Sequence, residues 1–485
     1  MKKLLVSVGF TFLLAGSLPA ATVENLPLPD LGGQSNALIS PLEEQRIGQS
    51  FMRNIRNMVT VYSDPLVTDY IQSLGLRLGN FSDNRSFDFT FFVVDDSSIN
   101  AFAGPGGYIG VHRGLIEAAN SESELASVLA HEIAHVTQFH LHRSLENARK
   151  MGIPTAAAII TAILIGATNP SAAEALIAAS VAGSAQSQLQ FSRSHEQEAD
   201  RVGISLMEQA GFDPRAMPAF FETLHKHTRI SDTGIPEFLA THPVTENRIA
   251  DSRNRAEQFP RKQHADSVEF NLLKVQLNLL SNTNPEKLHE QYQQALKNGQ
   301  FRNPFAIRYG LAMANIALKK YDLARTQLRH LIKDDQERSP YLLALAEVEK
   351  KAGNQQQALA VLKNAFSLYP NNVNIGVNYA KALQAKGSTE EARLLLRELI
   401  RTKPEVPEPY QVLGSLEEQS GRTGSAYRYI AEFHFLEGRT QFAIEHLKQA
   451  IKQNDVDKYT RSQIETRLTE FKEEFVRLKK EAERN

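Results

Sequence analysis

Residues 125–138 read LASVLAHEIAHVTQ, an apolar run that is interrupted by two histidines and a glutamate. In a helix with 3.6 residues per turn, His131 and His135 leave the same face one turn apart, and Glu132 lies beside them. Two imidazoles in this arrangement can bind one metal ion, and the carboxylate can take a proton from a water molecule. The stretch therefore predicts a helix that carries most of a zinc-hydrolase site.

The segments before this helix predict both helices and strands. Ser121 and Glu124 form a capping box, so the motif helix is expected to begin just before its apolar run. FDFTFFVVDD at 87–96 alternates apolar and polar residues as a strand does, and GGYIGVHRGLI at 106–116 predicts a second strand. Two stretches further upstream, PLEEQRIGQSFMRNIRN and DPLVTDYIQSLGLRLG, have helical spacing.

The glycines of GPGGYIG, residues 104–110, do not form a phosphate-binding loop, because position 109 is not a glycine and no helix follows at once. Two interpretations remain open. The glycines form a turn into a sheet-edge strand that could pair with an extended peptide, or they form the turn of a plain hairpin.

Catalytic zinc takes three protein ligands and keeps a fourth position for water, so a third ligand must lie elsewhere. The variant HExxHxxGxxH is excluded, because Gln138 and Leu141 stand where it needs glycine and histidine. His140 and His142 are close in sequence but lie at the wrong helical phase, and we expect both to be exposed helix residues.

A second predicted helix, SRSHEQEADRVGISLMEQAG at 192–211, offers the missing ligand. Glu196 and Asp200 are four residues apart and share one face. Glu196 can give an oxygen to zinc, while Asp200 accepts a hydrogen bond from the far nitrogen of a ligating histidine and fixes its tautomer. The alternative is that this acidic cluster, with Glu198, is a solvated helix face.

Four motifs in this order resemble those of the M48 family of zinc metallopeptidases. They are INAFAGPGGYIGVHRGL, HEIAH, EQEAD and THPVTENRI, and the resemblance covers roughly residues 41–255. It implies an α+β zincin-like metallopeptidase domain, mostly helical with a small sheet. It also implies one zinc ion per chain on the two histidines and Glu196, with Glu132 as the catalytic residue.

Two further sets of residues follow from the same resemblance. Asn100, Ala101 and Phe102, in the first motif, are the strand expected to pair with a substrate. His242 matches the His-Pro segment of the family, and a neutral imidazole that reached the metal would fill the open position and switch the enzyme off. Alternatively, His242 and Arg248 only anchor their loop, or His242 helps to bind the oxyanion.

A period of 34 residues governs the C-terminal half. Three kinds of position recur at this interval. They are alanines, glycines, and large residues that are each followed by a small residue. The alanines are Ala324, Ala358, Ala392 and Ala426, and the glycines are Gly353, Gly387 and Gly421. We therefore expect an all-α tetratricopeptide-repeat solenoid at 263–485, after a peptidase domain at 41–262. Such stacked helices form a concave surface that binds partner segments, with a simple spacer as the alternative.

The N-terminus has the features of an export signal. Residues 1–20 combine a basic start, an apolar run and small residues before a cleavage site near Ala20, and residues 21–40 resemble an extended linker. The chain has no cysteine, and its formal net charge of −1 does not indicate a nucleic-acid partner. We therefore expect an exported protein that relies on its hydrophobic core.

An Ala-rich segment at 155–186 is broken by Asn169 and Pro170 into pieces that are short for a membrane span. We expect a buried or groove-lining helical pair, with peripheral membrane contact as the alternative and a membrane-embedded protease as a more distant one.

The combination of an export signal, an M48-like domain and such repeats resembles periplasmic M48 peptidases of Gram-negative bacteria, and this resemblance implies a periplasmic protein that cleaves misassembled outer-membrane β-barrel proteins. The resemblance implies that unfolded polypeptide is the substrate, and that the repeats bind the barrel-assembly machinery or its clients. The rival hypothesis is a periplasmic chaperone or scaffold with a latent protease site.

Overall fold

The computed structural model describes residues 40–82, 84, 87–150, 193–230, 237–261 and 264–484. The predicted signal peptide, nearly all of the predicted linker and the Ala-rich segment at 155–186 lie outside these ranges. Within them, no helix is both long enough and apolar enough to cross a membrane.

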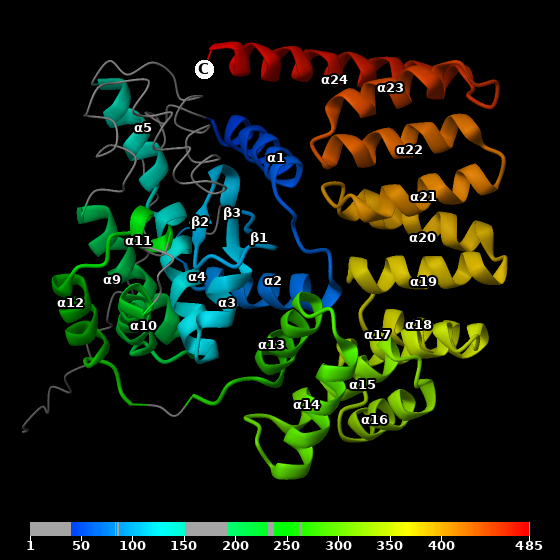
Figure 1. Cartoon of the computed structure of the whole chain (residues 1–485). Coiled ribbons are helices and arrows are strands. Elements are labelled where there is room, and N and C mark those ends of the chain that lie inside the picture. Colours follow the sequence, from blue (N-terminus) through cyan, green and yellow to red (C-terminus); the bar gives the residue numbers. More distant parts are fainter. Residues whose placement is uncertain are drawn as a thin grey trace, which may run out of the picture. The chain divides into compact units, whose positions relative to one another are not determined.

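The peptidase domain begins with two helices, α1 and α2 (Figure 1). Each has a capping side chain before it and a proline in its first turn. Helix α1 (Pro41–Met58) is capped by the Ser40 side chain, which accepts from the Glu43 amide at 3.2 Å. Helix α2 (Pro65–Gly79) is capped by Asp64 in the same way. Proline suits the first turn because its missing N–H would have no partner there.

A three-stranded sheet follows, with the order β1-β3-β2. Strand β1 (Thr90–Val94) pairs in parallel with β3 (Tyr108–His112), and β2 (Ala101–Ala103) pairs with β3 in antiparallel fashion. The 3₁₀ turn η1 (Pro105–Gly107) joins β2 to β3. Both predicted strands are confirmed. The edge interpretation is wrong for the strand after the glycines, because β3 is central and the edge strand β2 precedes the turn.

Helix α4 (Glu122–Thr137) carries the motif of residues 125–138 through the centre of the peptidase domain. All its residues except Val136 are buried, and it packs against α2, α9, α10 and β2. The Ser121 side chain accepts from the Glu124 amide as predicted, while the Glu124 carboxylate accepts from the Asn120 amide. This cap fixes the start of the helix and therefore the direction in which its histidines point.

The peptidase domain has six further described helices. They are α3 (Arg113–Ala118), α5 (His140–Lys150), α9 (Arg193–Gln209), α10 (Ala216–Ile230), α11 (Glu237–Thr241) and α12 (Glu246–Ala256). Of these, α5, α9 and α10 contact α4. Between α4 and α5, Phe139 has a φ of 55°, so a left-handed residue ends one helix and the next begins at once.

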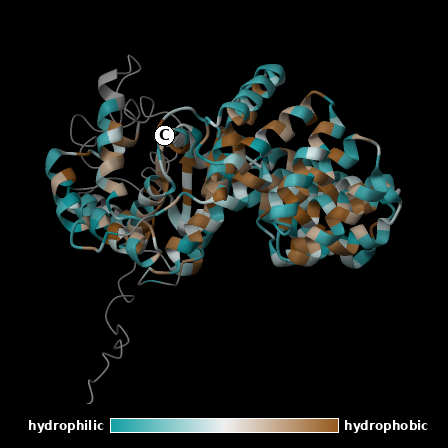
Figure 2. Ribbon diagram, turned by 90° about the horizontal axis from the view of Figure 1, so that it is seen from below, coloured by the Kyte–Doolittle hydropathy of each residue, from teal (hydrophilic) through white to brown (hydrophobic). Residues whose placement is uncertain are grey.

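The C-terminal half is a stack of helices. They are α13 (Val268–Ser281), α14 (Pro285–Asn298), α15 (Pro304–Ala317), α16 (Tyr321–Asp334), α17 (Ser339–Lys351), α18 (Gln355–Leu368), α19 (Val373–Lys386), α20 (Thr389–Thr402), α21 (Glu408–Gln419), α22 (Thr423–Leu436), α23 (Thr440–Ile451) and α24 (Lys458–Arg484). Hydrophobic and hydrophilic segments alternate along them (Figure 2), as expected for helices that bury one face against a neighbour.

The 34-residue period corresponds to these helix pairs, and the predicted solenoid is confirmed. The four periodic alanines are at most 6% exposed, because each packs between helices. Gly353, Gly387 and Gly421 all have positive φ, between 71° and 89°, which side chains other than glycine rarely adopt. The predicted boundary at 262 falls between α12 and α13.

Candidate metal centre

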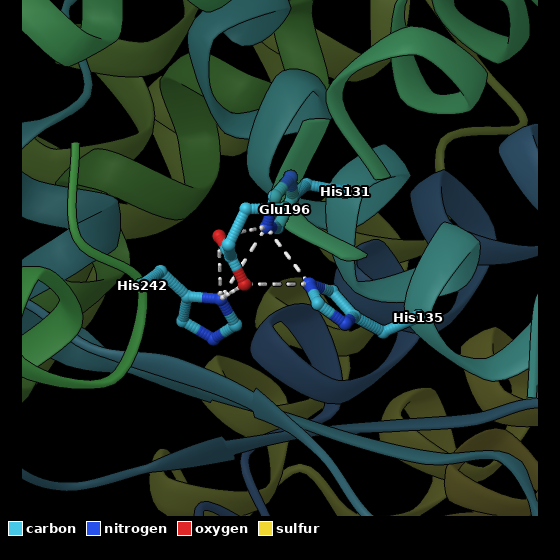
Figure 3. A group of neighbouring side chains, drawn as sticks. All are labelled: His131, His135, Glu196 and His242. Atoms are coloured by element: carbon cyan, nitrogen blue, oxygen red, sulfur yellow. Dashed lines mark hydrogen bonds and ion pairs between the residues drawn. The ribbon is translucent and has the colours of Figure 1, made fainter. Parts of the chain in front are cut away.

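The centre is formed by three elements (Figure 3). Helix α4 provides His131 and His135, the packed helix α9 provides Glu196 from its first turn, and His242 follows the end of α11. All four side chains are at least 98% buried. One ligand atom from each lies within 4.8 Å of all the others. The structure thus brings together the three predicted ligands and the predicted regulatory histidine.

The separations of these atoms suit a small tetrahedral ion. Nε2 of His131 is 3.0 Å from Nε2 of His135 and 3.5 Å from Oε2 of Glu196, and Nε2 of His135 is 3.4 Å from Oε1 of Glu196. Four ligands at the usual zinc distances of ~2.0–2.2 Å would be ~3.3 Å apart. Imidazole nitrogens and a carboxylate are also the donors that zinc prefers. The residues present therefore fit a metal ion.

His242 takes the fourth corner of this group. Its Nδ1 lies 3.0 Å from Oε1 of Glu196 and 3.4 Å from Nε2 of His131. Its Nε2 lies 3.7 Å from Oε1 of Glu132. The imidazole thus stands between the ligand atoms and the carboxylate beside them.

Glu132 is fully buried, and neither of its oxygens has a hydrogen-bond partner among the described residues. Burial raises its pKa, with His242 and His131 acting in the opposite direction. A buried carboxylate with free oxygens and a raised pKa is suited to accepting and returning a proton.

The carboxylates around the histidines determine their charges. Burial alone would lower the pKa of His131, but the Asp200 and Glu196 carboxylates raise it to about 9. Burial and the nearby His131 hold the pKa of His135 well below its usual range. Burial acts to raise the pKa of Glu196, but the surrounding histidines hold it well below its usual value. Glu196 is therefore an anion in the centre of the group.

Asp200 lies where the sequence predicts it, behind a histidine. Its Oδ1 is 3.0 Å from Nδ1 of His131. Arg248 donates to both Asp200 oxygens, at 2.8 and 2.7 Å, and lies 2.8 Å from Oε2 of Glu196. It also donates to the Pro243 carbonyl oxygen at 2.8 Å, so it connects the segment after α11 to the carboxylates of α9.

The predicted substrate strand is short and lies next to α4. Ala101 and Phe102 pair with Val111 and Gly110 of β3, and the Asn100 carbonyl oxygen accepts from the His112 amide at 2.9 Å. On its other side β2 has no paired strand among the described residues. A peptide could add there as a further strand.

The prediction for His140 is wrong, because this residue is fully buried. Its Nδ1 lies 2.9 Å from Nδ1 of His135, and its Nε2 lies 3.1 Å from Oε2 of Glu198. The helical phase argument fails because the chain turns at Phe139, where φ is 55°. No glycine or proline in TQFHLHR marks this turn. His142 is partly buried, with 20% of its side chain exposed.

Comparisons with known proteins identify the family of the chain. The sequence pattern of peptidase family M48 matches residues 65–256, and that of the tetratricopeptide repeat matches 350–416. The Beta-barrel assembly-enhancing protease of Escherichia coli K12 is 32% identical over 474 residues, which are 98% of this chain and 97% of that protein. The protein of the same name from Yersinia pestis is 32% identical over 90% of this chain and 88% of its own length.

A more distant relative matches less than half of the chain. The mitochondrial metalloendopeptidase OMA1 of Danio rerio is 30% identical over 207 residues, which are 41% of this chain and 43% of that protein. The chain therefore belongs to peptidase family M48, and it is a metallopeptidase whose peptidase domain is followed by tetratricopeptide repeats.

Proposed function

We propose that the chain is a periplasmic zinc endopeptidase that degrades misassembled outer-membrane β-barrel proteins and, through its repeats, assists their assembly. One observation carries the peptidase chemistry. The side chains of His131, His135 and Glu196 converge on one point beside the buried carboxylate of Glu132. The substrate class and the compartment are supported by the names of the full-length relatives and by the signal-like N-terminus.

Zinc is the metal that this donor set favours, since two imidazoles and one carboxylate are the ligands of many catalytic zinc sites. When bound, it supplies a Lewis acid that lowers the pKa of a water molecule towards ~7. Residues of the chain have the other roles in the mechanism. Asp200 orients His131 through Nδ1, and strand β2 offers its free edge to the main chain of the substrate.

Glu132 is the proton carrier in this mechanism. One of its oxygens accepts a proton from the attacking water and then gives it to the leaving amine when the peptide bond breaks. The raised pKa suits both halves of this cycle, because the group must bind the proton and release it again.

His242 acts as a removable plug. Its Nδ1 stands among the ligand atoms, and its Nε2 stands near Glu132, so the described arrangement leaves no room for a substrate carbonyl. Arg248 keeps the plug in place through the Pro243 carbonyl. Activity then requires the segment after α11 to move away.

The repeats provide the sites for client polypeptides. A cavity of about 410 Å³ lies among α20, α21, α22 and α24. Glu432, which accepts from Arg467, contributes to its lining together with four arginines and two tyrosines. These residues are Arg397, Arg401, Arg428, Arg467, Tyr410 and Tyr429. Arginine forks bind carboxylates in pairs of hydrogen bonds, and tyrosines bind main chain and rings. The cavity therefore suits an acidic segment of a client.

A photo-crosslinker at position 429 in Glu132→Gln protein tests whether the cavity binds clients. We expect it to capture unfolded barrel proteins, or their assembly machinery, more strongly than a crosslinker at position 459, which is exposed on α24. Equal capture at both positions would contradict a role for the cavity.

The closed arrangement of His242 also supports a second candidate function, a chaperone or scaffold with a latent peptidase site. Complementation of a deletion strain distinguishes the two functions, because only the peptidase function requires Glu132. If Glu132→Gln protein restored every defect of a deletion strain, the scaffold function would be correct.

The metal itself is tested by elemental analysis of the purified protein. We expect one zinc ion per chain, and loss of zinc in His131→Ala protein. Retention of zinc after this substitution would contradict the assigned ligands.

A further inference from the structure

His140 is a buried imidazole that the proposed mechanism does not use. It begins α5, and it is 0% exposed. Nδ1 lies 2.9 Å from Nδ1 of His135, Nε2 lies 3.1 Å from Oε2 of Glu198, and its ring stacks on His195 at a centroid distance of 4.4 Å. It therefore contacts the far side of a metal-site histidine, away from the ligand atoms.

The backbone is strained at the residue that places His140 there. Phe139 has a φ of 55°, a left-handed conformation that residues with a side chain rarely adopt. The strained residue is held on both sides, since its amide donates to the Val136 carbonyl at 3.0 Å and its carbonyl accepts from the Arg143 amide at 2.9 Å. A strained turn that persists beside a functional site indicates a role for what it positions.

The direction of each hydrogen bond follows from the chemistry of the partners. A carboxylate only accepts, so Nε2 of His140 donates to Glu198. A neutral imidazole carries one N–H, so Nδ1 of His140 must accept. The donor in the 2.9 Å contact is therefore Nδ1–H of His135.

That assignment fixes the other nitrogen of His135. With the proton on Nδ1, Nε2 carries a lone pair, and Nε2 is the atom that lies 3.0 Å from Nε2 of His131 and 3.4 Å from Glu196. The opposite tautomer would point an N–H at the metal position and could not bind an ion there.

We propose that His140 is a positioning residue that holds His135 in the Nδ1–H tautomer, so that its Nε2 can bind the metal. Glu198 fixes the tautomer of His140 in turn, and Arg143 holds Glu198 at 2.8 Å. His140 thereby does for His135 what Asp200 does for His131. This inference rests on the proposed metal site and adds a residue to it.

Two substitutions separate hydrogen bonding from packing. In His140→Leu protein the acceptor is lost, whereas in His140→Asn protein the amide oxygen can stand where Nδ1 stands. His142→Leu is the matched control on the same helix. We expect His140→Leu to weaken zinc affinity about 10–100-fold in competition with a chelator, and His140→Asn to recover most of that loss.

The tautomer can also be observed without metal or substrate. Nitrogen-15 spectra of histidine-labelled, metal-free protein should show His135 protonated at Nδ1 in the wild type and in His140→Asn protein, with this preference lost in His140→Leu protein. Circular dichroism checks that all variants are folded.

Three results would overturn the proposal. They are an Nε2–H tautomer of His135 in the wild type, unchanged zinc affinity in folded His140→Leu protein, and an equal loss in the leucine and asparagine variants. Failure of the proposed function gives a different result, because the wild type would then bind no zinc while the tautomer could still be measured.

Discussion

In the proposed mechanism, His242 occupies the place that a water molecule and a substrate carbonyl would need. Its Nδ1 is 3.0 Å from Glu196 and its Nε2 is 3.7 Å from Glu132. If His242 is a plug, His242→Ala should raise the rate of casein cleavage and of self-cleavage, because the site is then open. Zinc content should stay near one ion per chain, since the other three ligands remain.

The competing roles of His242 predict the opposite change or none. As an oxyanion donor, its loss should lower turnover by ~10²-fold or more. Unchanged activity would leave it a structural residue of its segment. Cleavage rates of wild-type and His242→Ala protein, normalised to measured zinc, decide among the three.

Single residues of the site could be predicted where local spacing determines which face they share. His131, His135, Glu196 and Asp200 obey this rule, and the structure places all four together. His140 does not obey it, because the left-handed Phe139 breaks the helix where the sequence gives no warning. Backbone strain of this kind is stabilised by tertiary contacts, such as the packing of Phe139 on the Phe87 ring at 5.6 Å, which no local pattern contains.

The turn between α15 and α16 has a lysine where the corresponding later turns have a glycine. Lys319 occupies the position of Gly353, 34 residues earlier, and it has a φ of 59°. Replacing it with glycine should relieve the strain and raise stability by about 0.5–1 kcal/mol. We expect a higher apparent melting temperature of the folded chain for Lys319→Gly, measured by circular dichroism.

Gly353→Ala is the matched control for this turn. A Cβ at Gly353 would meet no atom within 4 Å, so only the backbone conformation opposes it. This substitution should therefore lower the melting temperature, by an amount comparable to the gain at Lys319. A fall for Lys319→Gly would show that its side chain matters more than its φ.

Whole elements could be predicted when their signal is local and long enough. The helical spacing of α1 and α2, the cap of α4 and the 34-residue period predict the correct helices, because these signals lie within a few turns of the chain or recur at a fixed interval. Strand β2 has only three residues, too few for an alternating pattern. The alternating pattern therefore reveals only β1 and β3, and the position of Ala101 and Phe102 at the sheet edge is seen only in the folded structure.

Across the whole molecule, contacts between distant segments join the peptidase domain to the repeats. The Glu122 carboxylate, at the start of α4, accepts from the amide and the hydroxyl of Ser267 at 2.9 and 2.6 Å, and from the Tyr70 hydroxyl at 2.8 Å. Ser267 caps α13, the first helix of the repeat half. The N-termini of the motif helix and of α13 are thus fixed together.

Glu122→Ala should loosen this junction, because three donors lose a buried acceptor at a cost of about 1–3 kcal/mol. We expect a lower melting temperature and faster trypsin cleavage after Arg261, which is exposed between α12 and α13. Glu286→Ala, in the exposed first turn of α14, is the control and should change neither. Equal behaviour of the two variants would mean that the junction does not depend on Glu122.

Such long-range contacts mark the limit of what the sequence could predict. Arg53 of α1 donates to Glu474 of α24 although 421 residues separate them. Nothing in either local pattern indicates the other. Residue spacing predicted the elements of the peptidase domain and of the repeats. Only the folded structure shows which residues of the two parts contact each other.

The proposed mechanism depends most on Glu132, which transfers the proton from the water to the leaving amine. The decisive measurement compares zinc content and cleavage of an unfolded β-barrel protein in one preparation of Glu132→Gln protein, with the exposed Glu117→Gln as control. Glu132→Gln should retain one zinc ion per chain while cleavage falls by at least ~10²–10⁴-fold, because an amide cannot accept the proton. Cleavage at the wild-type rate by zinc-loaded Glu132→Gln protein would contradict the proposed mechanism.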